Sequence, residues 1–253
     1  MYINLSGLNI LVTGASKGIG KAIATKLAEA GATIAIHYNK NVREAENLAD
    51  VLGNEASVFQ ADLGNKEEIV RLFEQVTGRY GSLEILVNNA GIATSSPIDT
   101  ADDEWLTNWE NTLHVNLTAS ALLCKKAVNH FLSRKSSGRI INITSRATHR
   151  GDTPEYMAYA ASKAGMSSLT KTLARAYGKK GIKAFNVAPG FVRTDMAKNF
   201  ITEYGEEIAT KDLSLERLTE PKDIAPLVTF LASGMADHST GATFDLNAGS
   251  YVR

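Results

Sequence analysis

The chain has 253 residues, of which 44% are hydrophobic and 21% charged. This composition excludes disordered, collagen-like and coiled-coil proteins, and the length predicts a single domain over residues 1–253 with a large core. The 27 Lys and Arg residues balance 27 Asp and Glu residues, giving zero formal charge. We therefore expect no whole-protein positive field that would attract nucleic acid or an anionic membrane.

Cysteine, histidine and apolar runs restrict the chemistry further. Cys124 is the only cysteine in the sequence, which excludes an internal disulfide, and we expect it to be buried on a helix. The five histidines form no pair at metal-ligand spacing, so we expect no metal site. The N-terminal residues lack a basic leader, and no apolar run approaches the roughly 18 residues of a bilayer span. These features predict a cytoplasmic protein.

Seven short, apolar, β-branched runs alternate with longer amphipathic stretches along the chain. Such runs are typical of strands covered on both faces, with helices as the crossovers of a parallel sheet. The runs are Asn9–Thr13, Thr33–Ile36, Ser57–Gln60, Ile85–Asn88, Arg139–Ile143, Lys183–Val187 and Ala242–Leu246. The pattern predicts an α/β protein with a Rossmann-like, doubly wound, parallel sheet of seven strands and helices on both faces.

The first helix is predicted between the first two strands. Ile19, Ile23 and Leu27 recur every four residues, and Gly31 follows as the residue just beyond the C-cap.

Two later helices carry start signals. Asp152 and Pro154 predict a cap followed by proline at the first helical position, opening a long helix that continues to about Ala176. A similar start precedes Pro221. Residues 190–217 have mixed charge and no strong strand signal, so we expect a mobile lid there.

A glycine-rich loop joins the first strand to the first helix. Residues 13–20 read Thr-Gly-Ala-Ser-Lys-Gly-Ile-Gly, with glycines at 14, 18 and 20. Glycines let backbone amides approach an anion at a helix N-terminus, and this position in a βαβ unit favours a dinucleotide diphosphate over a merely tight turn.

The end of the second strand predicts the cofactor. An acidic residue there binds the ribose hydroxyls of NAD, whereas a basic residue accommodates the 2′-phosphate of NADP. Residues 37–40 read His-Tyr-Asn-Lys and contain no acid, and Lys17 adds a nearby cation. We therefore predict NADP(H); the alternative is that Lys17 and Lys40 are only solvated surface charges.

Tyr159 and Lys163 stand four residues apart on the predicted long helix and so share one face. An adjacent cation favours the phenolate, so we expect Lys163 to lower the Tyr159 pKa and suit it to proton exchange with an alcohol or ketone. The alternative for this short motif is a surface pair. Ser145 follows the fifth predicted strand and the Asn-Asn-Ala-Gly run at 88–91 ends the fourth, while Asn116 lies in the segment 114–117. Ser145 can donate to a carbonyl, while Asn116 either holds a water or helix kink or satisfies backbone groups.

Together these motifs resemble the short-chain dehydrogenase/reductase family over nearly the whole chain. The resemblance also uses Asp62-Leu63, Pro189-Gly190 with Thr194, and the Arg217 to Ala225 segment. It implies a catalytic set of Asn116, Ser145, Tyr159 and Lys163, with Tyr159 as acid-base residue, Ser145 as carbonyl partner, Lys163 as ribose ligand and Asn116 as water anchor. It implies cofactor contacts from Gly14, Ser16, Lys17, Gly18, Ile19, Gly20, Tyr38, Asn39, Lys40, Asp62, Leu63, Asn89, Ala90, Gly91, Tyr159, Lys163, Pro189, Gly190, Val192 and Thr194.

Within the family, the overall pattern is most similar to the 3-oxoacyl-acyl-carrier-protein reductases. Residues 146–152 are more polar and basic than that subgroup's usual stretch, and the C-terminal end also departs from it. Arg146, His149 and Arg150 therefore motivate the hypothesis of a polar or anionic substrate such as a sugar, a sugar acid or a carboxylated ketone. The alternative is a solvated rim.

The resemblance implies a small carbonyl or alcohol substrate and a homotetramer. Docking of an acyl-carrier protein would use Arg134, Lys135 and Arg175, although these residues can equally be ordinary helix-end charges. Two other classes stay open: a catalytically silent nucleotide sensor on the same fold, and a nucleotide-binding transferase such as a methyltransferase. Neither requires Tyr159 and Lys163 together.

Overall fold

The computed structural model describes residues 3–195, 197, 201, 205, 207 and 210–252. Seven parallel strands form its sheet in the order β3-β2-β1-β4-β5-β6-β7. The strands are β1 Asn9–Val12, β2 Thr33–Tyr38, β3 Ser57–Gln60, β4 Ile85–Asn88, β5 Gly138–Ile143, β6 Ile182–Pro189 and β7 Thr243–Leu246. Every predicted strand is present, and the predicted fold class is confirmed.

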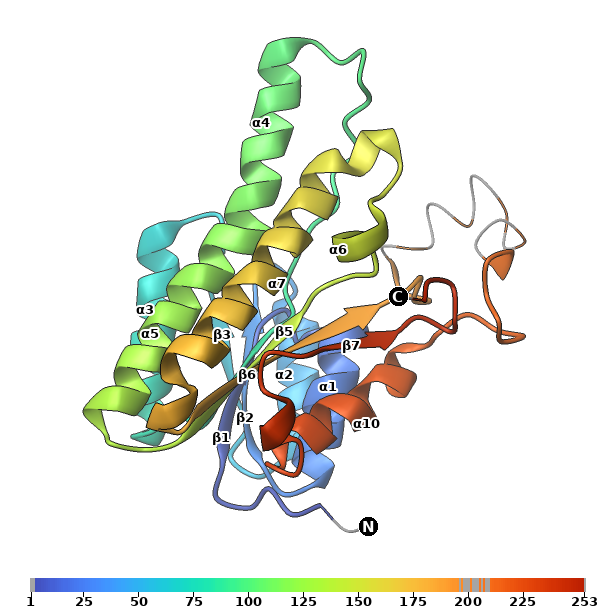
Figure 1. Ribbon diagram of the computed structural model, residues 1–253. Helices are drawn as coiled ribbons and strands as arrows, with labels where there is room; N and C mark the ends of the chain where they lie inside the picture. The colour runs from blue at the N-terminus through green and yellow to red at the C-terminus, as the bar shows by residue number, and fades with distance from the viewer. Residues whose placement is uncertain are drawn as a thin grey trace.

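Helices cover both faces of the sheet (Figure 1). The longer ones are α1 Gly18–Glu29, α2 Val42–Leu52, α3 Lys66–Tyr80, α4 Asp102–Leu113, α5 Ala119–Ser133, α7 Met157–Tyr177 and α10 Pro221–Ala232. Short turns of helix are α6 Ala147–Arg150 and the 3₁₀ segments Pro154–Tyr156, Gly178–Lys180 and Asp237–Ser239. A π-helical segment, His114–Thr118, joins α4 to α5.

Two apolar clusters lie on opposite faces of the sheet. Helices α1, α2 and α10 pack on one face, where Ile23 and Leu27 meet inward-facing strand residues such as Ile36. Helices α3, α5 and α7 pack on the other, around residues such as Leu86 and Phe131. The five inner strands are buried on both sides, which explains their continuous apolar sequences, whereas the edge strands β3 and β7 are partly exposed.

The predicted helix starts agree with the structure except at one residue. The long helix α7 ends at Tyr177 as expected, but it begins at Met157, after a 3₁₀ turn that Pro154 opens. The cap position before Pro154 is Thr153, so proline follows the cap as predicted. Asp152 itself is not the cap, because it stands one residue earlier and its carboxylate accepts the Thr153 N–H at 3.0 Å.

The second predicted start is confirmed at α10. Glu220 and Asp223 form a reciprocal capping box, and Pro221 occupies the first turn. The lid predicted over residues 190–217 falls partly outside the described residues, which end at 195 and resume fully at 210.

The strand order reverses between β1 and β4: β2 and β3 follow β1 toward one edge of the sheet, and β5, β6 and β7 follow β4 toward the other. In open α/β sheets the crevice outside the carboxyl ends of the strands at this point is the usual ligand site. The glycine loop after β1 and the run after β4 meet there.

Candidate active site

The glycine loop has the backbone that its sequence predicts. Gly14 and Gly18 adopt φ of 64° and 56°, a left-handed conformation that other residues rarely adopt. Gly20 has normal φ, yet a side-chain carbon there would collide with the Gly14 carbonyl oxygen and approach the Asn89 Nδ2 atom to 2.5 Å. The first turn of α1 can therefore lie directly against β4 only because this position is glycine.

The run after β4 braces this loop. Asn89 Nδ2 donates to the carbonyl oxygens of Thr13, at 2.8 Å, and Gly14, at 3.2 Å. In return, the Thr13 hydroxyl accepts the backbone N–H groups of Asn89 and Ala90 at 2.9 and 3.0 Å. These four bonds fix the glycine loop beside Gly91.

His37 is a member of this site that the sequence analysis missed. It is buried at 2% exposure in β2; its Nδ1 atom accepts the Gly14 N–H at 2.9 Å, and its Nε2 atom lies 3.0 Å from the Ala61 carbonyl oxygen. These partners require the neutral tautomer with the proton on Nε2. Burial lowers the His37 pKa to about 4, so the ring stays neutral at physiological pH. A histidine at the end of a strand, next to the predicted ribose-binding residues, was the available signal.

Residues predicted to contact the ribose end of the cofactor lie beside His37. Asn39 and Lys40 are exposed after β2, and Gln60 donates to the Asn39 carbonyl oxygen at 3.2 Å. Lys17 lies 3.8 Å from Asp195, and both side chains are more than half exposed. The predicted Asp62 carboxylate accepts the Gly64 N–H at 2.8 Å, so it shapes the turn after β3.

The second predicted group lies on α7. Lys163 is buried, its Nζ atom donating to the Ile143 carbonyl oxygen at 2.9 Å and lying 5.7 Å from the Tyr159 ring centre. Gly91 lies against it, because a side-chain carbon at Gly91 would be 3.3 Å from Lys163 Nζ and 3.2 Å from Asn116 Oδ1. The structure thus brings the run after β4, Asn116 and Lys163 together.

Asn116 occupies the π-helical segment between α4 and α5 and is fully buried. Its side chain accepts the Ile92 N–H at 2.8 Å and donates to the Ile92 carbonyl oxygen at 2.8 Å and to Ser162 Oγ at 3.0 Å. The reading of Asn116 as a buried amide that satisfies backbone groups is confirmed. A π-helical turn also marks the kink that was expected there.

Ser145 follows β5 and is buried at 8% exposure. Its hydroxyl accepts the Ala147 N–H at 3.1 Å and interacts with the Tyr159 hydroxyl. Two hydroxyls and an ammonium group therefore converge at the carboxyl edge of the sheet.

The prediction that Lys163 lowers the Tyr159 pKa was wrong. Burial raises the Tyr159 pKa to about 12, opposed by the Ser145 hydroxyl and assisted by the charge of Asp152. Burial also lowers the Lys163 pKa to about 8. The physical reason is that burial removes both groups from water, which disfavours the charged form of each.

The loop after β6 closes the other side of the crevice. Gly190 lies against Asn247, which would be 2.8 Å from a side-chain carbon at that position. Val192 is buried and its backbone pairs with that of Thr219. A side-chain carbon added at Gly18 would lie 3.6 Å from the Thr194 side chain. Thr194 thus lies against the glycine loop.

The basic stretch after Ser145 lies near Tyr159. The Arg146 backbone N–H donates to the Pro189 carbonyl oxygen at 2.9 Å, and the Arg150 guanidinium lies 3.7 Å from Asp212. Asp152 influences the pKa values of both Arg146 and Tyr159. Residues 146–152, which carry Arg146, Arg150 and Asp152, form a charged rim directly after Ser145.

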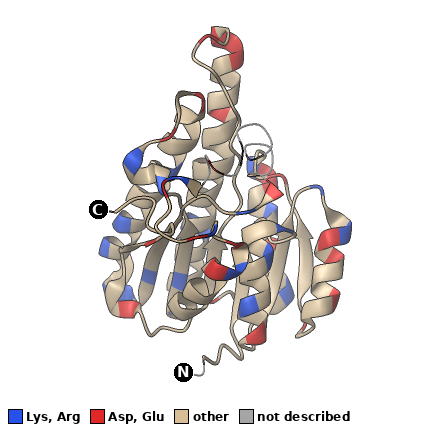
Figure 2. Cartoon of the chain, turned by 90° about the vertical axis from the view of Figure 1, so that its right-hand side faces the viewer, with Lys and Arg blue, Asp and Glu red and all other residues tan. Residues whose placement is uncertain are grey.

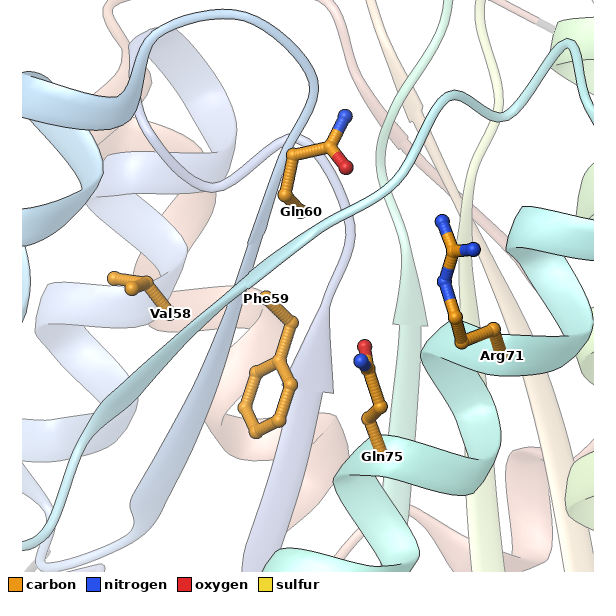
Figure 3. Close-up of a pocket in the computed structure, with 5 residues that line it drawn as sticks. All are labelled: Val58, Phe59, Gln60, Arg71 and Gln75. Atoms are coloured by element: carbon orange, nitrogen blue, oxygen red, sulfur yellow. The ribbon is translucent and has the colours of Figure 1, made fainter.

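Two cavities lie away from these side chains. One of about 440 Å³ lies between β3 and α3, lined by Val58, Phe59, Gln60, Arg71 and Gln75 (Figure 3). A wider one of about 1050 Å³ lies between residues 215–223 and the C-terminal segment 245–252. Neither contains a residue of the predicted catalytic set.

Several other predictions concern single features. Cys124 is buried in α5 as expected. Arg134 donates to the Gly81 carbonyl oxygen at the end of α3 at 3.1 Å, which is the helix-end role. Among the described residues, no three His, Cys, Asp or Glu side chains gather as metal ligands. Within the same part of the chain, none of the helices has the length and apolarity that a membrane span requires.

Residues 14–250 match the profile of a protein family described as enoyl-(acyl carrier protein) reductase. The chain is 38% identical to the 3-oxoacyl-(acyl-carrier-protein) reductase FabG of Vibrio cholerae, over 99% of this chain and 100% of that protein. It is 35% identical to 3beta-hydroxysteroid dehydrogenase 1 of Eggerthella lenta, over 98% of this chain and 95% of that protein.

Solved structures agree with these sequence matches. A dehydrogenase/reductase from Sinorhizobium meliloti 1021 superposes with a TM-score of 0.90 at 32% identity, covering 99% of this chain and 98% of that one. A structure described as an NAD(P)-dependent gluconate 5-dehydrogenase from Beutenbergia cavernae, with NADP bound at low occupancy, gives 0.90 at 30% identity, covering 99% of each chain. With the glycine loop, the braced run after β4 and the Tyr159–Lys163 pair in place, the chain belongs to the short-chain dehydrogenase/reductase family of oxidoreductases.

Proposed function

We propose that this protein is an NADP(H)-dependent enzyme that interconverts a ketone and a secondary alcohol. The observation that carries the proposal is the meeting of Ser145, Tyr159 and Lys163 at the carboxyl edge of the sheet, beside Gly91 and the glycine loop. When bound, the nicotinamide would donate or accept the hydride.

Tyr159 serves as the proton donor and acceptor. Its raised pKa, about 12, keeps the phenol protonated at neutral pH. In reduction the carbonyl carbon gains a hydride while the carbonyl oxygen takes the Tyr159 proton, and Ser145 donates a hydrogen bond to the same oxygen. In oxidation the alcohol proton returns to Tyr159. The protonated phenol is the form that donates a proton in reduction.

Lys163 and Asn116 position the reacting groups. Lys163 Nζ lies beside Gly91, where its ammonium would hold the ribose hydroxyls of the bound cofactor. Asn116 commits its side chain to Ile92 and Ser162, so it orders the floor of the site and anchors a water there only through its remaining acceptor capacity.

The glycine loop would hold the dinucleotide diphosphate through its backbone amides and the α1 N-terminus. Two observations support this fit: glycine is required at 14, 18 and 20, and Thr194 lies against Gly18. The Beutenbergia cavernae protein carries NADP. The absence of an acid in residues 37–40, with Lys17 and Lys40 nearby, favours NADP(H) over NAD(H) for this chain.

Two substrate classes are supported by separate observations. Identity of 36–38% to FabG proteins favours a 3-oxoacyl chain on an acyl-carrier protein. The charged rim at residues 146–152 and the gluconate 5-dehydrogenase neighbour favour a sugar acid or another small carboxylated ketone. The helix-end contact of Arg134 weakens the first class, because that side chain is engaged within its own fold.

The test is loss of NADPH absorbance with a panel of neutral and carboxylated ketones, in wild type and Tyr159→Phe. We expect Tyr159→Phe to lower kcat/KM by about 10²–10⁴-fold and to leave the NADPH Kd within threefold of wild type. Full turnover by the variant, or no affinity of the wild type for NADPH or NADH by calorimetry, overturns the proposal.

Family resemblance also leads us to propose a homotetramer in the cytoplasm. Leu106 is 48% exposed on α4, beside the stacked Trp105 and Trp109 rings, and this apolar side of α4 supports contact between copies. Light scattering coupled to gel filtration measures the assembly, and a monomeric mass contradicts it.

A further inference from the structure

We propose that Arg146 binds an anionic group of the substrate, a carboxylate or a phosphate. The inference rests on the proposed function and names the substrate class of that site. It starts from the residue directly after Ser145, whose hydroxyl faces Tyr159.

The backbone holds Arg146 at the edge of the site. Its N–H donates to the Pro189 carbonyl oxygen at 2.9 Å, and its own carbonyl oxygen accepts the His149 and Arg150 N–H groups at 3.1 and 3.2 Å. The residue is therefore fixed between the end of β6 and the short helix α6, and its side chain starts from a rigid base.

The guanidinium has a donor with no partner. Arg146 Nη1 is buried from water and makes no hydrogen bond with any described residue. A buried, unpaired donor on a charged group is costly, and an oxyanion is its natural acceptor. On the same turn Thr148 Oγ1 is likewise buried without a partner in the described structure, so the turn presents two unsatisfied polar atoms.

The charges around Arg146 leave this donor open to a ligand. Asp212 lies 3.7 Å from the Arg150 guanidinium and acts on Arg146 through space. Asp152 acts on Arg146 through space and bonds instead to the Thr153 N–H. The neighbouring positive charge of Arg150, together with burial, disfavours the charged form of Arg146, and a bound anion relieves both costs.

Arg146 lies near the chemistry because it directly follows Ser145, whose hydroxyl interacts with that of Tyr159, and because its backbone is held at the end of β6. A substrate whose ketone meets Tyr159 therefore carries its anionic group a short chain away, as in a small keto acid.

The experiment compares anionic ketones with neutral partners, a methyl ester or the free alcohol, which share the ketone and differ in charge. The probes are levulinate and methyl levulinate, acetoacetate and methyl acetoacetate, and dihydroxyacetone phosphate with dihydroxyacetone. Binding is measured by calorimetry with and without NADPH, and turnover by NADPH oxidation. We expect the wild type to bind at least one anion more tightly than its neutral partner. In Arg146→Gln, we expect the affinity for that anion to fall by about 10–100-fold, while the affinity for the neutral partner stays within threefold of wild type.

Two further variants separate recognition from structure. Arg146→Lys keeps the charge without the forked donors, so we expect an intermediate preference. Arg79→Gln removes the same charge from an exposed position near the C-terminal end of α3 and should leave the preference unchanged.

Equal losses for acid and ester in Arg146→Gln, or an unchanged acid-to-ester ratio, overturn the inference. So does wild-type protein that binds none of the anions. Failure of the proposed function is distinguishable, because it appears as absent NADPH oxidation or absent NADPH binding, whatever the ratio of acid to ester binding.

Discussion

At the residue scale, the site depends on polar groups whose protonation is decided by burial. Tyr159, Lys163 and His37 all shift toward their neutral forms, because the crevice withholds water from each of them. Sequence spacing correctly identified Tyr159 and Lys163 as neighbours, but it predicted the opposite direction for the Tyr159 pKa. Spacing reports proximity, whereas desolvation depends on everything that packs around the pair.

His37 gives a prediction on stability. Its folded-state pKa of about 4 lies below the ordinary 6.5, so the unfolded chain takes up the proton first as pH falls. The contribution of His37 to the free energy of unfolding is complete above pH 6.5 and decreases as the pH falls toward 4. At pH 4 the loss amounts to about 3 kcal/mol. The His37→Gln variant, which cannot titrate, should lack this part of the pH dependence in urea unfolding followed from pH 7 to pH 4.

Carboxylates titrate in the same pH range in the wild type and in the variant. The quantity to compare is therefore the difference between the two proteins in the free energy of unfolding at each pH. Parallel pH profiles for the two would show that His37 is not the titrating group.

At the element scale, the glycine loop and α1 act as one unit, and two glycines on helices test it. Gly20→Ala places a methyl group against the Gly14 carbonyl oxygen and Asn89. We expect a loss of about 1–3 kcal/mol from overpacking and at least tenfold weaker NADPH binding, since the loop must shift. Chemical denaturation and calorimetry measure the two effects.

Gly78→Ala is the matched control. Gly78 lies exposed in α3, and a side-chain carbon there meets nothing within 4 Å. Alanine should therefore stabilise the helix by about 0.5–1 kcal/mol and leave NADPH binding unchanged. Similar behaviour of the two variants would contradict the steric role assigned to Gly20.

At the scale of the whole molecule, buried asparagines connect the strands beneath the site. Asn88, Asn142 and Asn186 occupy register partners on β4, β5 and β6. Asn88 donates to Asn142 at 2.8 Å, Asn142 donates to Thr170 of α7 at 2.7 Å, and Thr170 lies 2.6 Å from Asn186. The network ties the helix that carries Tyr159 and Lys163 to the centre of the sheet.

Breaking the network should lower the stability of the whole domain. In Asn142→Leu, the Asn88 amide and the Thr170 hydroxyl each lose a buried partner, so we expect a loss of about 2–4 kcal/mol. Asn111→Leu, at an exposed position on α4, is the control and should change little. Urea unfolding compares them, and a loss below about 1 kcal/mol in Asn142→Leu would show that the neighbours find other partners.

Charge is spread over the molecule without a dominant sign (Figure 2). Acidic residues gather at the start of α4, where Asp102, Asp103 and Glu104 form the first turn. The balance predicted from composition thus holds across this view of the chain, although a local cluster stands out.

The sequence by itself determined the strands, the order of helices and the candidate catalytic set, because continuous apolar runs, glycine spacing and the Tyr159–Lys163 interval are local signals. Only the tertiary structure decided what lies around those residues. It brought His37 of β2 to the Gly14 amide, left an Arg146 donor buried without a partner, and raised the pKa of Tyr159. Burial and long-range pairing arise from segments distant in the chain, so no local pattern of residues encodes them.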